Sequence, residues 1–246
     1  MEEPLLNDAR GYVKGICSAH GIDESHAIKH AIAVENHIRR CFEADTIFNL
    51  DNQTKTDLLL AGLLHDVDDH KYFEENSRNA AEFLETRISC ERASRVSRWI
   101  SYVSASKNGN MIPPEAMKHP WVLWVRYCDR IEAVGVIGIQ RTLEYNRRHG
   151  APDFQETTPK ATTREEVIKF ATKERFEEYQ LTGKSLSAID HIFDKLLHLC
   201  DVSTSSPEGV AASPSSPYID TQLLLGKQAL IDVCINYGKF GRLILS

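Results

Sequence analysis

Apolar residues recur every three or four positions along most of this chain, which restricts the folds available to it. In residues 26–42 they form one stripe, which an α-helix would place on a single face. The stripe consists of Ala27, Ala31, Val34, Ile38 and Phe42. Comparable patterns occupy residues 9–22, 76–88, 92–103, 120–148, 164–181, 187–199 and 220–240. Runs of β-branched residues bounded by turn signals are almost missing, so the sequence predicts an all-α fold.

Several helix boundaries are marked by residues with known capping preferences. Gly21 is a good terminator for the first helix, and Asp23 or Ser25 can cap the second. Thr54 or Thr56 is expected to open a third helix that runs through the apolar residues 58–64. Residues 120–148 are expected to form one long apolar helix, with Pro120 well placed at its start.

The domain organisation follows from one change in composition. Residues 202–218 are rich in Ser, Pro and Ala with almost no helical periodicity, which is typical of a flexible surface insert. We therefore expect one domain over residues 1–201 and a C-terminal helix within residues 219–246 that packs back on it. A chain of 246 residues that is 42% hydrophobic is large enough for such a core.

Charge and cysteine content exclude several classes of protein. A net charge of −6 argues against a protein that binds nucleic acid by neutralising phosphates, and against a basic membrane-surface protein. No stretch approaches eighteen consecutive apolar residues, and the acidic start "MEEPLLNDAR" is unlike a signal peptide. The six cysteines are scattered singly, which predicts reduced thiols in a cytoplasmic protein. The sequence leaves the oligomeric state open.

Residues 58–73, "LLLAGLLHDVDDHKYF", begin as an apolar run and end in a crowd of charged groups. A carboxylate loses several kcal/mol on leaving water unless a cation or a hydrogen-bond donor meets it. The apolar part predicts a buried helix, yet His65 and Asp66 follow it directly. Either this helix ends at the surface, or a buried metal ion binds its end.

Two other segments also place a potential metal ligand on an apolar helical face. His26 and His30 are four residues apart and project from the same side of one helix. Asp129 lies in the most apolar segment of the chain, where a lone carboxylate needs a partner. A single buried histidine is usually a hydrogen-bonded core residue, and the pair His-Asp often arises by chance. The combination of all these positions favours a metal site.

Three stretches carry these residues: "HAIAV" (30–34), "LLHDV" (63–67) and "CDRIEAVGVIGIQRT" (128–142). Together they resemble the motifs of the HD superfamily of metal-dependent phosphohydrolases, most closely its small single-domain bacterial-type branch. The resemblance covers residues from about 10 to 200. It implies a helical bundle that holds one divalent metal ion. The implied ligands are His30, His65, Asp66 and Asp129.

This ligand set is chemically reasonable. Two imidazoles and two carboxylates suit Mn²⁺, Mg²⁺, Fe²⁺, Co²⁺ or Ni²⁺ and leave coordination positions open for water and a substrate oxygen. Such an ion acidifies water and neutralises charge on a phosphoryl group. His26 could replace His30 as a ligand, although the spacing from His30 to Val34 favours His30, and we place His26 near the substrate. A surface histidine at the start of the helix is an equal alternative.

The resemblance also implies a role for Asp69, as the acid that orients the attacking water. Asp69 would face the same side as His65 if the helix continued for one more turn. Asp68 would then point elsewhere, and we expect it to be solvated. Lys71 can reach over the site and offer its ammonium group to a phosphate; a surface lysine at a helix end would read the same way.

Further cations are candidates for binding a phosphorylated substrate. Arg141 within "GIQRTL" needs an anionic partner, either substrate or protein such as Glu132, and Arg130 is a weaker candidate. Lys107 lies in "SYVSASKNGN", which resembles a phosphate-facing loop of the same branch, although a plain turn would look identical. One departure is Ala33, because related proteins often carry Arg at this point of the first motif.

The predicted function is hydrolysis of a phosphate ester or anhydride, with nucleotides as the expected substrates. The alternative is an HD-type di-iron oxygenase, which needs additional histidines between Asp66 and Asp129. Only His70 and His119 occur there, which disfavours this alternative. A non-catalytic binding module is a third class, and the intact ligand set argues against it.

Overall fold

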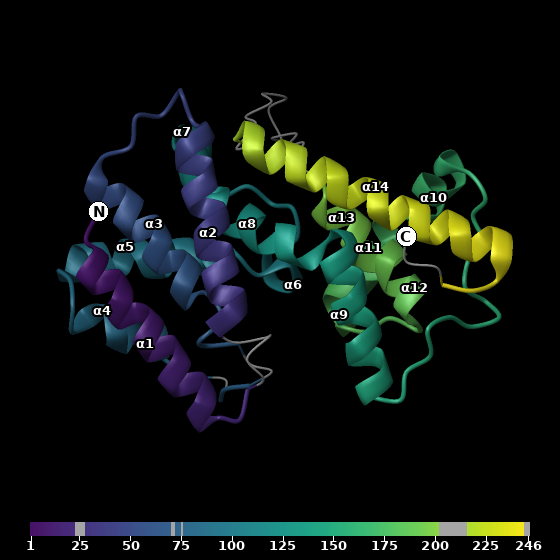
Figure 1. Ribbon diagram of the computed structural model, residues 1–246, viewed down its shortest axis with the longest axis horizontal. Helices are drawn as coiled ribbons and strands as arrows, with labels where there is room; N and C mark the ends of the chain where they lie inside the picture. Colours follow the sequence, from purple (N-terminus) through teal and green to yellow (C-terminus); the bar gives the residue numbers. More distant parts are fainter. Residues whose placement is uncertain (23–27, 70–71, 75, 202–215, 244–246) are drawn as a thin grey trace. The chain divides into compact units, whose positions relative to one another are not determined.

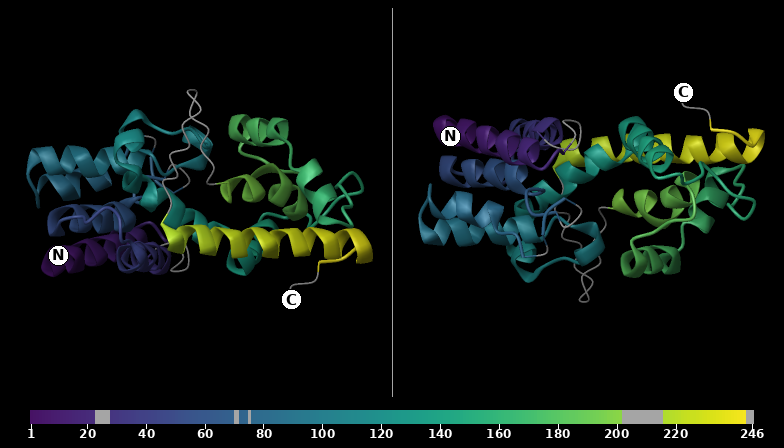
Figure 2. Two further views of the ribbon diagram at one scale, coloured as in Figure 1. Left: turned by 90° about the horizontal axis from the view of Figure 1, so that it is seen from above. Right: turned by 90° about the horizontal axis from the view of Figure 1, so that it is seen from below.

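The computed structural model describes residues 1–22, 28–69, 72–74, 76–201 and 216–243 (Figure 1). Helices and loops make up this described part, without any β-strand, so the all-α prediction is confirmed. Figure 2 shows the same helices from two further directions. None of the described helices is long and apolar enough to cross a membrane.

The described residues form two compact units. Unit 1 comprises Met1–Val103, Pro113–Asp129 and Pro214–Ile219, and unit 2 comprises Ser104–Ile112, Arg130–Ser213 and Asp220–Ser246. The helices with elements in unit 1 are α1 (Glu3–Ala19), α2 (Ile28–Ala44), α3 (Asn52–Leu64), α4 (Asn79–Glu85), α5 (Cys90–Ser101), α7 (Pro114–Lys118), the 3₁₀ helix η1 (Pro120–Leu123) and the first part of α8 (Trp124–Ala133). Those of unit 2 are α6 (Ala105–Asn108), α9 (Gly135–Arg148), α10 (Arg164–Phe170), α11 (Lys173–Thr182), α12 (Ala188–His191), the π-helical segment η2 (Ile192–Leu196), α13 (Leu197–Leu199) and most of α14 (Pro217–Phe240).

Helix α3 is the centre of unit 1. Every residue from Thr56 to Leu64 is buried, and α1, α2 and α5 pack around it. Its N-cap is Asp51, whose carboxylate accepts a hydrogen bond from the backbone N–H of Thr54 at 2.6 Å. The expected cap at Thr54 or Thr56 was therefore wrong. Asp51 caps because it stands just outside the helix, where its carboxylate reaches an N–H that has no helical partner.

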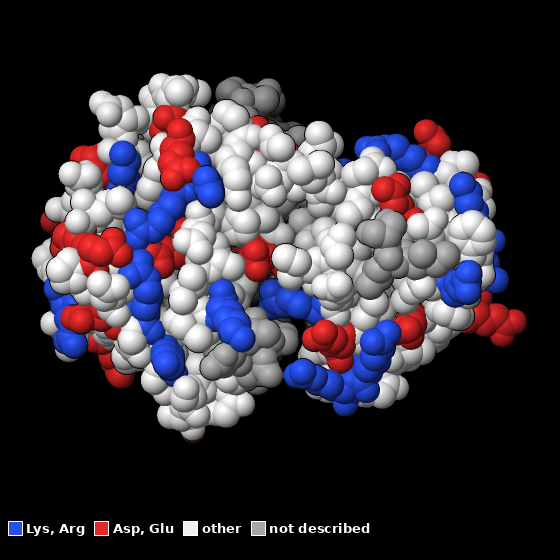
Figure 3. All heavy atoms as spheres, in the orientation of Figure 1, with Lys and Arg blue, Asp and Glu red and all other residues white. Residues whose placement is uncertain are grey.

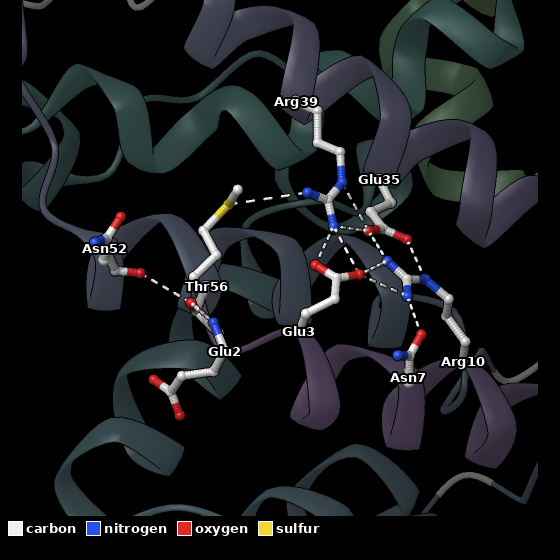
Figure 4. Close-up of polar contacts among 9 residues, drawn as sticks. Glu2, Glu3, Asn7, Arg10, Glu35, Arg39, Asn52 and Thr56 are labelled. Carbon is white, nitrogen blue, oxygen red and sulfur yellow. Dashed lines mark hydrogen bonds and ion pairs between the residues drawn. The ribbon is translucent and has the colours of Figure 1, made fainter.

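Buried acids in unit 1 are paired with arginines (Figure 4). The Glu35 side chain on α2 is 2% exposed, and it accepts hydrogen bonds from Arg10 Nε at 2.8 Å and Arg39 Nη2 at 2.7 Å. Asp57 on α3 is fully buried and binds Arg92 at 2.7 Å and also Arg95. Two guanidinium groups offset the loss of hydration at each carboxylate, which ties α1 to α2 and α3 to α5.

The long helix expected over residues 120–148 is broken. The 3₁₀ helix η1 precedes α8, and α8 ends at Ala133 before α9 begins at Gly135. Val134 is extended, and Gly135 has a φ of +71°, which a glycine adopts without strain. A Cβ at Gly138 would lie 2.0 Å from the carbonyl oxygen of Ala133, so this junction depends on glycine. Helical periodicity alone did not reveal the break.

A second expected helix, residues 164–181, is also divided. Helix α10 ends at Phe170, and α11 begins at Lys173 with Thr172 as its N-cap. The Thr172 hydroxyl accepts a hydrogen bond from the backbone N–H of Arg175. Because Thr is favoured at N-caps, its side chain starts a new helix where the apolar pattern suggested continuity.

The last helix, α14, starts at Pro217, two residues before the expected boundary at 219. The hydroxyl of Ser216 accepts a hydrogen bond from the backbone N–H of Ile219 at 3.2 Å. Within unit 2, the ring of Tyr237 on α14 packs 5.0 Å from that of Phe154. The rest of the expected insert, residues 202–215, lies outside the described residues, and the domain boundaries stay a prediction.

We expect Gly238→Ala on α14 to destabilise the protein by about 1–3 kcal/mol, as overpacking of a core typically does. A Cβ at this position would lie 1.9 Å from the carbonyl oxygen of buried Ala161, and backbone atoms cannot move aside easily. The matched control is Gly15→Ala on α1, where nothing lies within 4 Å. That variant should gain about 0.5–1 kcal/mol from helix propensity. Chemical denaturation would measure both, and equal effects would contradict the packing argument.

Candidate metal centre

Three helices of unit 1 bring potential metal ligands together. His30 lies in the first turn of α2, and His65 and Asp66 directly follow α3, with His65 still in helical conformation. Asp129 lies on α8. The predicted residues His30, His65, Asp66 and Asp129 are therefore neighbours, although up to ninety-nine positions separate them along the chain.

The donor atoms of these residues converge on one point. His30 Nε2 lies 3.2 Å from His65 Nε2 and 3.2 Å from Asp129 Oδ1. His65 Nε2 lies 3.3 Å from Asp66 Oδ1. The remaining separations are 3.5 Å between His30 and Asp66 and 3.6 Å between His65 and Asp129. Two imidazole nitrogens and two carboxylates thus face one another across a small space.

This arrangement fits a divalent cation. Ligands bound at right angles, each ~2.1 Å from the ion, are about 3 Å apart. The observed separations of 3.2–3.6 Å need only a small contraction to reach that value. The group His30, His65 and Asp66 by itself satisfies the spacing that a bound ion requires. The donor set combines neutral nitrogen and anionic oxygen, as transition-metal and magnesium sites in proteins do.

The backbone of α3 orients the His65 ring. His65 Nδ1 lies 2.8 Å from the carbonyl oxygen of Gly62, which can only accept, so Nδ1 carries the proton and donates it. In its neutral form the ring would therefore present the lone pair of Nε2 to the other members of the cluster. Metal-binding histidines commonly donate their second nitrogen in this way. His30 Nδ1 is a buried nitrogen without a hydrogen-bond partner among the described residues.

Electrostatics of the cluster favour a positive charge at its centre. Burial lowers the pKa of the His65 imidazole, but the charges of Asp66 and Asp129 outweigh burial and raise that pKa to about 10. Burial raises the pKa of the Asp129 carboxyl, but hydrogen bonds with His30 and His65 bring it well below its usual value. A proton shared by these groups can balance the carboxylates, and a metal ion binding there would displace it.

One side of the cluster is open to solvent. The side chains of His30 and His65 are only 3% and 1% exposed, whereas those of Asp66 and Asp129 are 46% and 28% exposed. The imidazoles would thus bind an ion from the buried side, and water or substrate would reach it from the side of the carboxylates.

Comparison with solved structures shows the same helical architecture elsewhere. An HD-superfamily hydrolase from Bacillus thuringiensis superimposes with a TM-score of 0.61 at 19% identity, covering 97% of both chains. The chain has the fold of the HD superfamily. A Lactobacillus plantarum protein superimposes with a TM-score of 0.64 at 18% identity over 97% of both chains. The Lin1889 protein of Listeria innocua has a TM-score of 0.56 at 18% identity, covering 96% of this chain and 95% of its own.

A sequence relative is known from a virus. The uncharacterized protein L803 of Acanthamoeba polyphaga mimivirus is 33% identical over 240 residues, covering 92% of this chain and 93% of that protein. The chain belongs to the same family as this viral protein. No family model matches the chain.

Asp68 and Asp69, which follow His65 and Asp66 in the sequence, lie in positions that differ from those expected. Helix α3 ends at Leu64, and the next residues form turns, with the backbone N–H of Asp69 bonded to the carbonyl of Asp66 at 3.1 Å. The helical register that aligned Asp69 with His65 therefore does not apply. Asp68 is half-buried and accepts hydrogen bonds from the backbone N–H groups of Asn79 at 2.7 Å and Ala80 at 3.1 Å. The expectation that Asp68 is solvated was wrong, because it caps α4.

The expected substrate-binding residues have mixed outcomes. His26 and Lys71 lie outside the described residues. Arg130 belongs to unit 2 and is 1% exposed. It donates from Nη1 to Asn110 Oδ1 at 2.9 Å and from Nη2 to the carbonyl of Gly109 at 2.7 Å. These contacts hold the loop after α6, and the role of Arg130 in substrate binding stays a prediction.

Two other cations remain candidates in unit 2. Arg141 on α9 is half-buried and donates to the backbone carbonyl of Glu132 at 3.4 Å, so the Glu132 carboxylate is not the acceptor in this contact. Lys107 is exposed on the short helix α6, which Ser104 caps. The segment expected to be a phosphate-facing loop is thus helical at residues 105–108. On the face drawn in Figure 3, basic and acidic side chains are interspersed.

Sequence reasoning missed Gly62 as part of this centre. Its carbonyl accepts the His65 hydrogen bond, and it is buried in the last turn of an apolar helix. A glycine inside a helix is unfavourable by roughly 1 kcal/mol relative to alanine, so its presence within "LLLAGLLHD" was a usable signal. The Glu35 pairing with two arginines gave no local signal.

We expect Asp68→Ala to lower the free energy of unfolding by about 1 kcal/mol, because it removes the carboxylate that caps α4. Thermal denaturation of the purified variant would measure this. The control is Asp8→Ala, whose carboxylate is 60% exposed and 3.6 Å from Arg87, a surface pair that contributes little. If both variants had the melting temperature of the wild type, the capping role would be refuted.

Proposed function

We propose that this protein is a divalent-metal-dependent phosphohydrolase that cleaves a phosphate ester or anhydride of a nucleotide. The observation that carries the proposal is the convergence of four donor atoms from His30, His65, Asp66 and Asp129 at the end of a buried helix. The HD-superfamily fold supports it at the level of the enzyme class. The nucleotide is favoured by the motif resemblance and is open to direct assay.

In this proposal the four residues would hold one ion of Mn²⁺, Mg²⁺, Fe²⁺, Co²⁺ or Ni²⁺. When bound, such an ion supplies an acidified water and neutralises charge on the phosphoryl group. His65 keeps its lone pair directed inward through its bond to Gly62. The two carboxylates match the charge of a divalent ion, so the loaded centre would be neutral before an anionic substrate arrives.

Asp69 is the proposed acceptor for the proton of the attacking water. It lies in the turn directly after the HD pair, in a half-buried position. Lys71, His26, Arg141 and Lys107 stay candidates for contacts with the phosphates. A panel of nucleoside mono- and triphosphates and sugar phosphates, with phosphate and pyrophosphate assayed separately, would identify the substrate and the bond that is cleaved.

The di-iron alternative requires additional histidines near the first metal. His119, at the end of α7, instead has its ring 5.5 Å from that of Trp121, and His70 lies outside the described residues. The four converging donors are sufficient for one ion. Metal analysis giving two irons per chain, in place of one divalent ion, would favour the oxygenase.

We expect His65→Ala and Asp129→Ala each to weaken metal binding by at least ~100-fold, since even outer contacts of metal sites typically contribute 10–100-fold. Turnover should disappear with the metal. Isothermal titration with Mn²⁺ would measure the affinity, and His119→Ala would serve as a control that retains it. A variant that kept both metal and full activity would remove that residue from the ligand set.

The Asp69 role predicts an effect on chemistry alone. Asp69→Asn preserves the shape of the side chain and removes its ability to accept a proton. General-base groups typically contribute ~10²–10⁴-fold, so kcat should fall in this range with KM and metal affinity little changed. Loss of the metal would instead make Asp69 a ligand. A normal kcat would mean that another group accepts the proton.

A further inference from the structure

Gly62 lies where α2 packs against α3, within unit 1. A Cβ at this position would lie 2.5 Å from Ile38 Cδ1, 3.5 Å from Val34 Cγ1 and 3.9 Å from the backbone nitrogen of Glu35. Val34 and Ile38 are fully buried, so neither side chain has solvent to move into. A Cβ at residue 62 would therefore displace the end of the Ile38 side chain within a closely packed interior.

The Val34 contact is about one helical turn from each imidazole, and the closer Ile38 contact is about two turns from His30. His30 precedes Val34 by four residues on α2, and His65 follows Gly62 by three residues at the end of α3. The start of α2 and the end of α3 therefore meet, with the Nε2 atoms of His30 and His65 3.2 Å apart. A change in the packing of α2 and α3 at Gly62 would therefore act on the distance between the two histidines.

Gly62 acts on the centre in a second way through its carbonyl. The bond from His65 Nδ1 to this oxygen, 2.8 Å long, sets both the ring orientation and the nitrogen that is left to bind metal. A displacement of the α3 backbone at residue 62 would therefore move the carbonyl that orients His65 as well as the helix that carries His65.

We propose that Gly62 is a positioning residue of the metal centre, which sets the separation of His30 and His65 by its lack of a side chain and aims His65 by its carbonyl. This inference rests on the metal centre of the proposed function. It assigns a role in metal affinity to a residue that contributes no side chain to the site.

The test is the dissociation constant of Mn²⁺ for folded Gly62→Ala, measured by isothermal titration, with the absorption spectrum of bound Co²⁺ as a second readout of ligand geometry. We expect affinity to fall about 10- to 100-fold, the range typical of contacts that orient a metal ligand. Gly11→Ala on α1 is the matched control, because nothing lies within 4 Å of its added Cβ. Its affinity and Co²⁺ spectrum should equal those of the wild type.

A second substitution tests the mechanism. Ile38→Val removes the Cδ1 atom that lies 2.5 Å from the new Cβ, so Gly62→Ala combined with Ile38→Val should recover most of the affinity. Ile38→Val alone leaves the ligands in place and should bind like the wild type. Circular dichroism of each metal-free variant checks that it is folded. If only the single variant fails to fold, recovery of both fold and affinity in the double variant supports the spacing role.

The remaining outcomes overturn the inference in different ways. A wild-type chain that binds no divalent ion would refute the metal centre itself. Metal binding by the wild type with an equal dissociation constant for Gly62→Ala would refute only the role of Gly62, even if the melting temperature fell. If neither the single nor the double variant folded, Gly62 would be needed for the packing of the helices in general, and the specific role at the metal centre would be refuted.

Discussion

The packing of α2 against the buried helix α3 is the interaction on which the candidate centre depends. Helix α3 is surrounded by α1, α2 and α5, so its end is delivered to a defined place within unit 1. Helix α2 passes close to Gly62, and His30 Nε2 lies 3.2 Å from His65 Nε2. The third element, α8, adds Asp129 to this pair. If α2 and α3 moved apart, His30 and His65 would separate, because the two residues are far apart in the sequence.

Charge compensation explains why some buried acids are structural and others are available for chemistry. Glu35 and Asp57 each meet two arginines, whose guanidinium groups satisfy the carboxylate oxygens and leave no need for an ion. Asp129 instead meets two imidazoles, and Asp66 is half exposed beside them. Imidazoles balance a carboxylate only when protonated, and a divalent cation can take the place of that proton.

The pairs around Glu35 also bear on the first motif, in which Ala33 stands where related proteins often have Arg. Arginines are supplied to α2 from other positions: Arg10 comes from α1 and Arg39 from one turn further along α2. Both contact Glu35, two residues after Ala33. Helix α2 therefore has cationic partners without an Arg at residue 33, on a face that residue 33 does not share with Glu35.

The sequence by itself determined the helical class, the approximate helices and the candidate metal ligands, because periodicity and residue chemistry are local properties. It did not reveal the breaks at Val134 and after Phe170, where caps and glycine override the apolar pattern. Only the tertiary structure decided that Asp68 caps α4, that Arg130 holds the loop at Gly109, and that Gly62 lies against Ile38. Each of these depends on which distant backbone comes within hydrogen-bonding or van der Waals distance, and that is set by helix packing over the whole unit.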